Sequence, residues 1–291
     1  MKFWLAIFFG CCISFSGNAQ WSDPPPLRVF HDLDSALMFP DQPMELYLDN
    51  RGLEVVPSSI KQLSGLQRLS LQFNSIHEIP EWIGAMKNLQ SLNFYHNQIA
   101  AIPSELYECN SLSILNIEHN KLKGITGGIS KLRNLSVLWL AQNQIQEVPV
   151  EVYALSNLID LRLRENRILV LPEGISQMRQ LQKICMARNQ LTALPADIYL
   201  LPHLFYFSFW ENPLAAISDS IAQLPRLEYI NLMSCGLKTI NLTIFEMPNL
   251  NLVNLAGNHF SDGFQKKLNR LAKRRKIQME SSNSKCAADF K

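Results

Sequence analysis

An asparagine that returns with a 23-residue period constrains this chain more than any other feature of its sequence. The period runs through Asn74, Asn97, Asn120, Asn143, Asn166, Asn189 and Asn212, and it resumes at Asn258 after one position held by Cys235. Self-similarity at a fixed period is typical of repeat architectures. The 291 residues are therefore predicted to form one stack of similar units, although their number alone would suggest one or two compact domains.

Apolar residues accompany each asparagine at fixed offsets. One copy holds Leu66, Leu69, Leu71, Asn74 and Ile76, and the general pattern is L-x-x-L-x-L-x-x-N-x-L. Most copies continue with an apolar residue and a proline. Ten such 23-residue frames cover residues 43–272 without an insertion or deletion.

The pattern predicts a local structure for each frame. Alternating leucines indicate a short strand with one face buried. The asparagine amide can satisfy backbone groups at the tight turn that follows. A proline fits an extended or one-turn-helical return arm. Because one frame cannot bury its own apolar face, the frames must stack.

This pattern resembles the 23-residue form of the leucine-rich repeat family, over nearly all of the chain after its first segment. The resemblance implies an α/β solenoid, a horseshoe of about ten repeats with a parallel sheet on its concave side. The ends of the chain are most like those of exported bacterial members, because no cysteine-rich cap of the animal type is visible.

We divide the chain into a signal peptide (1–20), an N-terminal cap (21–42), the leucine-rich repeats (43–260) and a C-terminal cap helix with a tail (261–291). Within the caps we expect a short helix over 32–38, an amphipathic basic helix over 263–274 and a final strand over 276–279. The basic run 273–276 fits a solvated cap face, and a contact with an anionic membrane or a glycan is the alternative.

The first twenty residues are typical of an export signal. Lys2 precedes an apolar run from Phe3 to Phe15, and small polar residues follow up to Gln20. The run is shorter than the ~20 residues that span a bilayer. We expect a secreted or cell-envelope protein, in the periplasm or at the cell surface, without an integral span after cleavage. A retained anchor and lipidation at Cys11 remain alternatives.

The near-neutral net charge argues against one class of partner. Lys and Arg exceed Asp and Glu by 27 to 25, so nucleic acid is not an expected partner.

Cys109 and Cys235 occupy positions where the pattern predicts burial. Repeats stack at ~4.8 Å, which places Cys185 about 10 Å from Cys235, beyond the ~7 Å reach of a disulfide. No disulfide is therefore expected in the solenoid.

Outward-facing strand positions form the predicted partner-binding wall. The side chains of interest are large rings and basic groups, which often dominate interface energies. They are Tyr95, Trp139, Arg162, Arg164, Lys183, Tyr206, Trp210 and Tyr229. Trp139 with Arg162, and Trp210 beside Tyr206 and Tyr229, are the expected anchors. In the alternative interpretation the rings are structural and acids such as Asp160 and Glu165 pair with the arginines.

Catalytic patterns are weak. His96, His119 and Glu118 have no further ligand to complete a metal site, and Cys185 has no histidine beside it to act as a base. No phosphate-binding loop or zinc-protease helix is present. We predict no enzyme activity, no metal and no cofactor.

The expected function is non-enzymatic binding of a protein or peptide ligand through the concave sheet. The alternative is an envelope-structural or glycan-binding adhesion protein.

Overall fold

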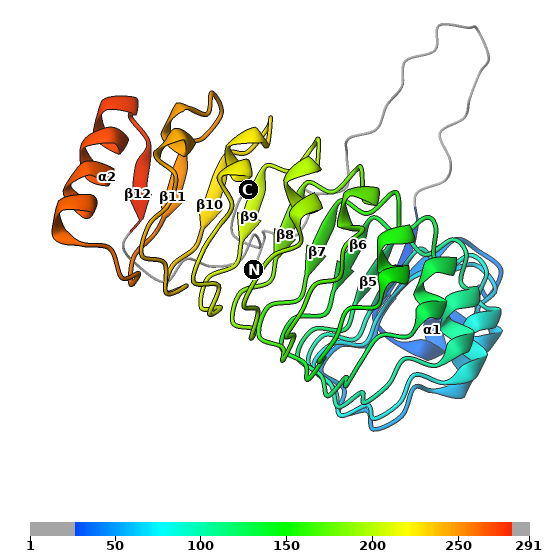
Figure 1. Ribbon diagram of the computed structural model, residues 1–291. Helices are drawn as coiled ribbons and strands as arrows, with labels where there is room; N and C mark the ends of the chain where they lie inside the picture. Colours follow the sequence, from blue (N-terminus) through cyan, green and yellow to red (C-terminus); the bar gives the residue numbers. More distant parts are fainter. Residues whose placement is uncertain (1–26, 281–291) are drawn as a thin grey trace, which may run out of the picture.

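A computed structural model describes residues 27–280, which form a curved solenoid built around one parallel sheet (Figure 1). Its twelve strands follow one another in chain order, and each pairs in parallel with its neighbour. The chain has the fold that the repeat pattern predicts. The expected signal peptide and the end of the tail lie outside the described residues.

The strands are short, most of them three residues long. They are β1 Arg28–Phe30, β2 Met44–Tyr47, β3 Leu66–Ser70, β4 Ser91–Asn93, β5 Ile114–Asn116, β6 Val137–Trp139, β7 Asp160–Arg162, β8 Lys183–Cys185, β9 Tyr206–Ser208, β10 Tyr229–Asn231, β11 Leu252–Asn254 and β12 Gln278–Glu280. The ten frames supply β2 to β11. The other two strands extend the sheet by one strand at each end.

Register follows the repeat. Leu138 of β6 pairs with Leu161 of β7, which pairs with Ile184 of β8, so equivalent residues stand side by side. These inward side chains are 0 to 1% exposed and belong to one core that runs the length of the solenoid. Their neighbours in each strand point to the concave side.

The repeated asparagine closes each turn as predicted. In one copy the Asn166 amide nitrogen donates to the carbonyl oxygens of Leu140 at 3.0 Å and Leu163 at 2.9 Å, and its oxygen accepts from the Ile145 N–H at 2.9 Å. One side chain thereby ties two successive repeats together. This explains why a polar residue is buried in the turn.

The residue before each asparagine, or before the Arg51 and Cys235 that replace it, adopts a left-handed backbone. The set is Asn50, Phe73, His96, His119, Gln142, Glu165, Arg188, Glu211, Ser234 and Gly257, with φ between 53° and 68°. Only some of these residue types favour that conformation. The turn geometry therefore fixes this row of side chains along one margin of the sheet.

Cys109 and Cys235 are buried as expected, whereas Cys185 departs from the expectation of no disulfide. Cys109 and Cys235 are buried free thiols, and burial raises their pKa to about 11 and about 12. Cys235 donates to the Phe209 carbonyl oxygen at 3.3 Å in place of the missing asparagine. Cys185 is disulfide-bonded. The expectation of no disulfide is therefore wrong, because it weighed only distances between repeats.

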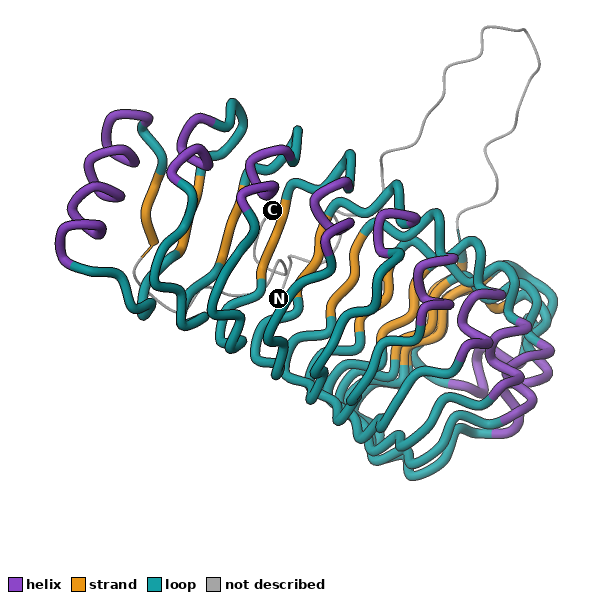
Figure 2. Tube along the Cα trace, viewed as in Figure 1, coloured by secondary structure: helices purple, strands orange, loops and turns teal. Residues whose placement is uncertain are grey.

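Short 3-10 helices form the convex side, opposite the strands (Figure 2). They are η1 Ser58–Gln62, η2 Glu81–Ala85, η3 Ser104–Glu108, η4 Gly127–Lys131, η5 Val150–Ala154, η6 Ile175–Gln177, η7 Ala196–Leu200, η8 Asp219–Gln223 and η9 Leu242–Glu246. Five begin directly after a proline, as at Pro80 and Pro149. Proline suits that position because its fixed φ starts the turn and no N–H is lost from it.

Two α-helices lie near the ends of the sheet. The first, α1 Leu33–Leu37, begins where the Asp32 carboxylate accepts from the Ser35 N–H at 2.8 Å. The second, α2 Asp262–Arg275, is one residue longer at each end than expected and packs Leu268 and Ala272 against the last repeats. The strand expected over 276–279 begins two residues later, and β1 was not expected.

Candidate functional site on the concave sheet

The predicted partner-binding residues fall on neighbouring strands. Trp139 ends β6 and is in register with Arg162 at the end of β7. Lys183, Tyr206 and Tyr229 begin β8, β9 and β10 and are in register with one another. Tyr95, Arg164 and Trp210 each lie two residues beyond a strand. The register divides the set into two groups along the sheet and leaves Tyr95 apart from both.

Trp139 and Arg162 form the contact that was predicted for them. The guanidinium carbon lies 4.0 Å from the centroid of the indole ring. The Asp160 carboxylate forms an ion pair with this guanidinium, with 2.8 Å between Oδ2 of Asp160 and Nη2 of Arg162. Asp160 and Arg162 are buried, whereas Trp139 is partly exposed. The carboxylate and the cation thus fix the ring before any partner arrives.

A second group surrounds the tyrosines. The rings of Tyr206 and Tyr229 stack with their centroids 4.5 Å apart and an interplanar angle of 14°. They belong to a small apolar cluster on the concave side that also contains Cys185, Ala187, Trp210 and Met233. Tyr206, Trp210 and Tyr229 are only 2 to 3% exposed. Sequence reasoning grouped these rings correctly, but it did not foresee that they would be buried.

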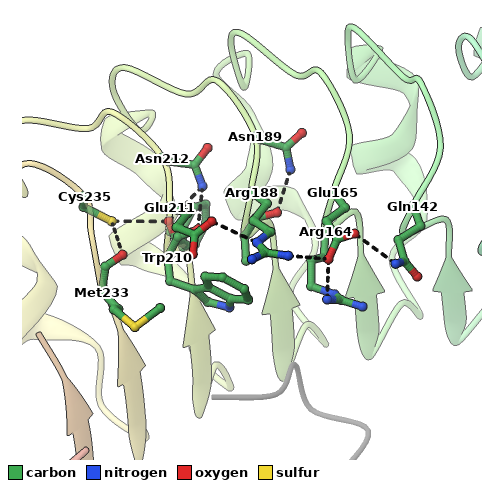
Figure 3. A network of polar contacts seen from close by, with 12 residues as sticks. Gln142, Arg164, Glu165, Arg188, Asn189, Trp210, Glu211, Asn212, Met233 and Cys235 are labelled. Atoms are coloured by element: carbon green, nitrogen blue, oxygen red, sulfur yellow. Dashed lines mark hydrogen bonds and ion pairs between the residues drawn. The ribbon is translucent and has the colours of Figure 1, made fainter. Parts of the chain in front are cut away.

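A charged ladder, formed by Gln142, Glu165, Arg188 and Glu211, runs along the margin of the sheet (Figure 3). Glu165 accepts from Gln142 at 2.9 Å and from Arg188 at 3.3 Å, and Arg188 also donates to Glu211 at 2.9 Å. Arg164 adds a bond to Glu165 at 2.6 Å. Glu165 is the hub, because donors from three successive repeats meet on its carboxylate.

The ladder sets the charge state of its members. Burial alone would raise the pKa of Glu165, but the bond from Gln142 and the two arginines outweigh burial and lower that pKa. The bond to Glu211 raises the pKa of Arg188. Arg188 also lies over Trp210, with 4.8 Å between the guanidinium carbon and the ring centroid. Glu165 and Arg188 therefore stay charged at neutral pH, and the ladder packs against the aromatic cluster through Arg188.

The predicted basic group is consequently neutralised within the fold. Asp160 pairs with Arg162, while Glu165 and Glu211 pair with Arg164 and Arg188. This is the mixed-charge arrangement that the sequence left as an alternative. Among the described residues Lys183 enters no ion pair, and its ammonium lies 5.6 Å from the Phe205 ring centroid. The concave face thus offers a partner little free positive charge.

Sequence reasoning missed an aromatic ledge formed by Phe73, Tyr95, His96 and His119. The His96 and His119 rings stack at 5.6 Å, and Tyr95 meets Phe73 at 5.2 Å and His119 at 5.0 Å, edge to face. Phe73 remains 47% exposed. The signal was available, because Phe73, His96 and His119 share one position of the 23-residue frame.

Burial shifts the pKa of two groups at the ledge, Glu118 and His119. Burial raises the pKa of Glu118 against the lowering effect of Arg162 and Arg164. Burial, together with His96 and Arg164, lowers the pKa of His119, so that imidazole is neutral at pH 7. Within residues 27–280 no three His, Cys, Asp or Glu side chains are grouped to hold a metal ion.

Comparison with known sequences decides the family. The leucine rich repeat profile matches residues 44–99, 64–122 and 133–191. The chain belongs to the leucine-rich repeat family. No curated protein matches it significantly.

Solved leucine-rich repeat structures share its fold. The internalin inlF from Listeria monocytogenes is 16% identical over 84% of this chain and 73% of its own, with a TM-score of 0.66. The ectodomain of the receptor kinase GASSHO1/SCHENGEN3 from Arabidopsis thaliana, in complex with CASPARIAN STRIP INTEGRITY FACTOR 2, is 26% identical over 75% of this chain, with a TM-score of 0.65. The plant peptide hormone receptor RGFR1, in complex with RGF2, is 27% identical over 75%, with a TM-score of 0.57.

The plant proteins are much longer than this leucine-rich repeat chain. It spans 27% of the GASSHO1/SCHENGEN3 chain and 39% of the RGFR1 chain. Bacterial and plant structures fit the solenoid about equally well, so the comparison of shapes supports the fold without favouring either source. Every helix within residues 27–280 is too short or too polar to cross a lipid bilayer.

Proposed function

We propose that this leucine-rich repeat protein is a non-enzymatic binding module that holds a protein or peptide ligand against its concave sheet. The observation that carries the proposal is the Trp139 ring, which is partly exposed and fixed by Arg162 and Asp160. A rigid ring loses little conformational entropy when a partner covers it. Tryptophan is also among the residues that most often dominate interface energies.

The structure suggests different roles for the predicted residues. Tyr95, Trp139, Arg164 and Lys183 are partly exposed and would make direct contacts. Arg162, Tyr206, Trp210 and Tyr229 are buried and would support the surface from below. The aromatic ledge would extend the contact area towards the N-terminal repeats, since Tyr95 belongs to both sets.

Similar structures support a peptide or protein as the partner. GASSHO1/SCHENGEN3 and RGFR1 are each described in complex with such a ligand. Neither of these structures is described with a glycan, and no observation here favours the adhesion alternative. The apolar first segment of the sequence leads us to place this binding outside the cytoplasm, in the cell envelope or in secreted form.

Selection from a random peptide display library tests the proposal. The enriched peptides are then titrated against the wild type and Trp139→Ala. We expect at least a tenfold loss of affinity, because hot-spot truncations commonly cost about 2 kcal/mol or more. Trp82→Ala, on the convex helix η2, removes the same ring from the other side and should leave affinity unchanged.

Two results would contradict the concave site. One is a set of enriched peptides that bind Trp139→Ala as tightly as the wild type. The other is a greater loss in Trp82→Ala than in Trp139→Ala when both variants remain folded by circular dichroism. Either result would move the binding surface away from the strands.

A further inference from the structure

A stripe of positive charge lies on the outer face of α2, which closes the C-terminal end of the solenoid (Figure 1). Its side chains are Lys266, Lys267, Arg270, Lys273 and Arg274, all exposed. At 100° per residue they fall within an arc of about 120°, and they extend along about 12 Å of the helix. The apolar residues of α2 face the last repeats instead.

This basic stripe is not neutralised as the concave arginines are. Within residues 27–280 no carboxylate forms an ion pair with any of its five side chains. Residues 262–276 carry seven basic groups and one acidic group, a net charge of +6, while the whole chain carries +2. The rest of the chain therefore carries −4. The molecule is strongly polarised, with its positive charge concentrated at one end.

Closing the solenoid does not account for the stripe. The helix dipole favours cations in the last turn, which explains Lys273 and Arg274 but not Lys266 or Lys267 nearer the start. Like charges four residues apart, such as Lys266 and Arg270, repel each other and weaken a helix. Arg275 performs the capping contact, since it donates to the Phe245 carbonyl oxygen at 3.0 Å.

We propose that the basic stripe of α2 docks the protein onto an anionic lipid surface. Basic residues near such a membrane each contribute favourable electrostatic energy. The apolar face of α2 is already buried in the solenoid, so the contact is electrostatic and does not require insertion. The stripe contains no aromatic residue to stack on bases, which favours a membrane over a single-stranded nucleic acid.

The geometry gives this contact a consequence for the rest of the molecule. The stripe lies at one end of the solenoid, whereas Trp139 lies in its central repeats (Figure 1). Docking by α2 leaves the concave sheet uncovered. The inference is independent of the proposed concave ligand, and either can fail without the other.

Vesicle co-sedimentation tests the proposal on the full chain. Vesicles of phosphatidylglycerol mixed with phosphatidylcholine are compared with phosphatidylcholine alone. We expect an excess of binding to the anionic vesicles that disappears as salt rises from about 0.1 M to about 1 M. The variant Lys266→Gln/Lys267→Gln/Arg270→Gln should lower this excess about a hundredfold.

A matched control removes the same charge elsewhere. Lys61→Gln/Arg133→Gln/Lys238→Gln changes three exposed, scattered basic residues and should keep the excess binding. Equal losses in both variants would show a net-charge effect and overturn the proposal. Equal binding to both vesicle types would also overturn it, as would binding to duplex DNA without binding to anionic vesicles. Circular dichroism of both variants confirms that they are folded.

Discussion

At the scale of single residues, the buried asparagine links successive repeats through hydrogen bonds. Its amide group satisfies backbone donors and acceptors of two successive repeats, which no apolar side chain can do. The leucines can exchange with isoleucine, methionine or phenylalanine along the core, as Ile184 and Phe207 show. After the first repeat, only Cys235 replaces the asparagine in this chain, and its sulfur contacts the carbonyl oxygens of Phe209 and Met233.

Replacing Asn166 by alanine should lower the free energy of unfolding by about 2 to 4 kcal/mol, because several buried backbone groups lose their partners together. Denaturant unfolding followed by circular dichroism measures the change. Asn134→Ala is the matched control, because the Asn134 amide donates to the Asn110 carbonyl oxygen at an exposed site. The free energy of unfolding of the Asn134→Ala variant should fall by about 1 kcal/mol or less. Equal losses in the two variants would contradict the assigned role of the buried amide.

Sequence reasoning succeeded at this scale where position in the frame decides burial. It identified the inward leucines, the turn asparagines and the buried Cys109 and Cys235. It did not foresee the burial of Tyr206, Trp210 and Tyr229, because outward position in the frame does not by itself mean exposure. Their role in partner binding stays a prediction. Sequence reasoning also failed for Cys185, which is disulfide-bonded, because only the distances between repeats were weighed.

At the scale of elements, the side chains of the charged ladder connect four successive turns by hydrogen bonds and ion pairs along one margin of the sheet. Each member lies one frame after the previous one, and the left-handed turn aims each side chain at its neighbour in the next repeat. The pattern of leucines does not predict the ladder, because the ladder depends on which side-chain rotamers meet across four successive repeats. The frame does predict that residues 142, 165, 188 and 211 are neighbours.

Removing the negative charge of Glu165 should leave more unpaired positive charge on the concave side. In Glu165→Gln the guanidinium groups of Arg164 and Arg188 lose their shared carboxylate, so retention on a heparin column should extend to higher salt. Glu147→Gln removes the same charge from an exposed side chain outside the ladder. The difference in elution salt between the two variants is the measurement, and elution at the same salt would contradict the pairing.

At the scale of the whole molecule, each repeat contacts mainly its neighbours, so stability should be local along the axis. The caps determine how the two ends behave. The repeat pattern predicted the length and curvature of the solenoid because both follow from stacking one unit. It did not predict β1, since Arg28–Phe30 lies before the first 23-residue frame.

Weakening one cap should therefore loosen only the nearest repeats. Leu268 of α2 is fully buried, and Leu268→Ala should lower stability by about 2 to 5 kcal/mol. Hydrogen exchange should then accelerate in β10 to β12 and remain unchanged in β2 to β4. Leu46→Ala, in the fully buried core of β2, should give the reverse distribution. A uniform acceleration along the chain in either variant would contradict local stability.

The register that β3 to β11 keep between successive repeats also bears on how such a protein can change in evolution. Duplication or loss of one frame adds or removes a complete strand and turn without disturbing the pairing on either side. Each such event shifts α2 relative to the central repeats by about 4.8 Å. Lineages could therefore adjust the reach between a docked end and a ligand-holding surface in whole steps, while both surfaces keep their own residues.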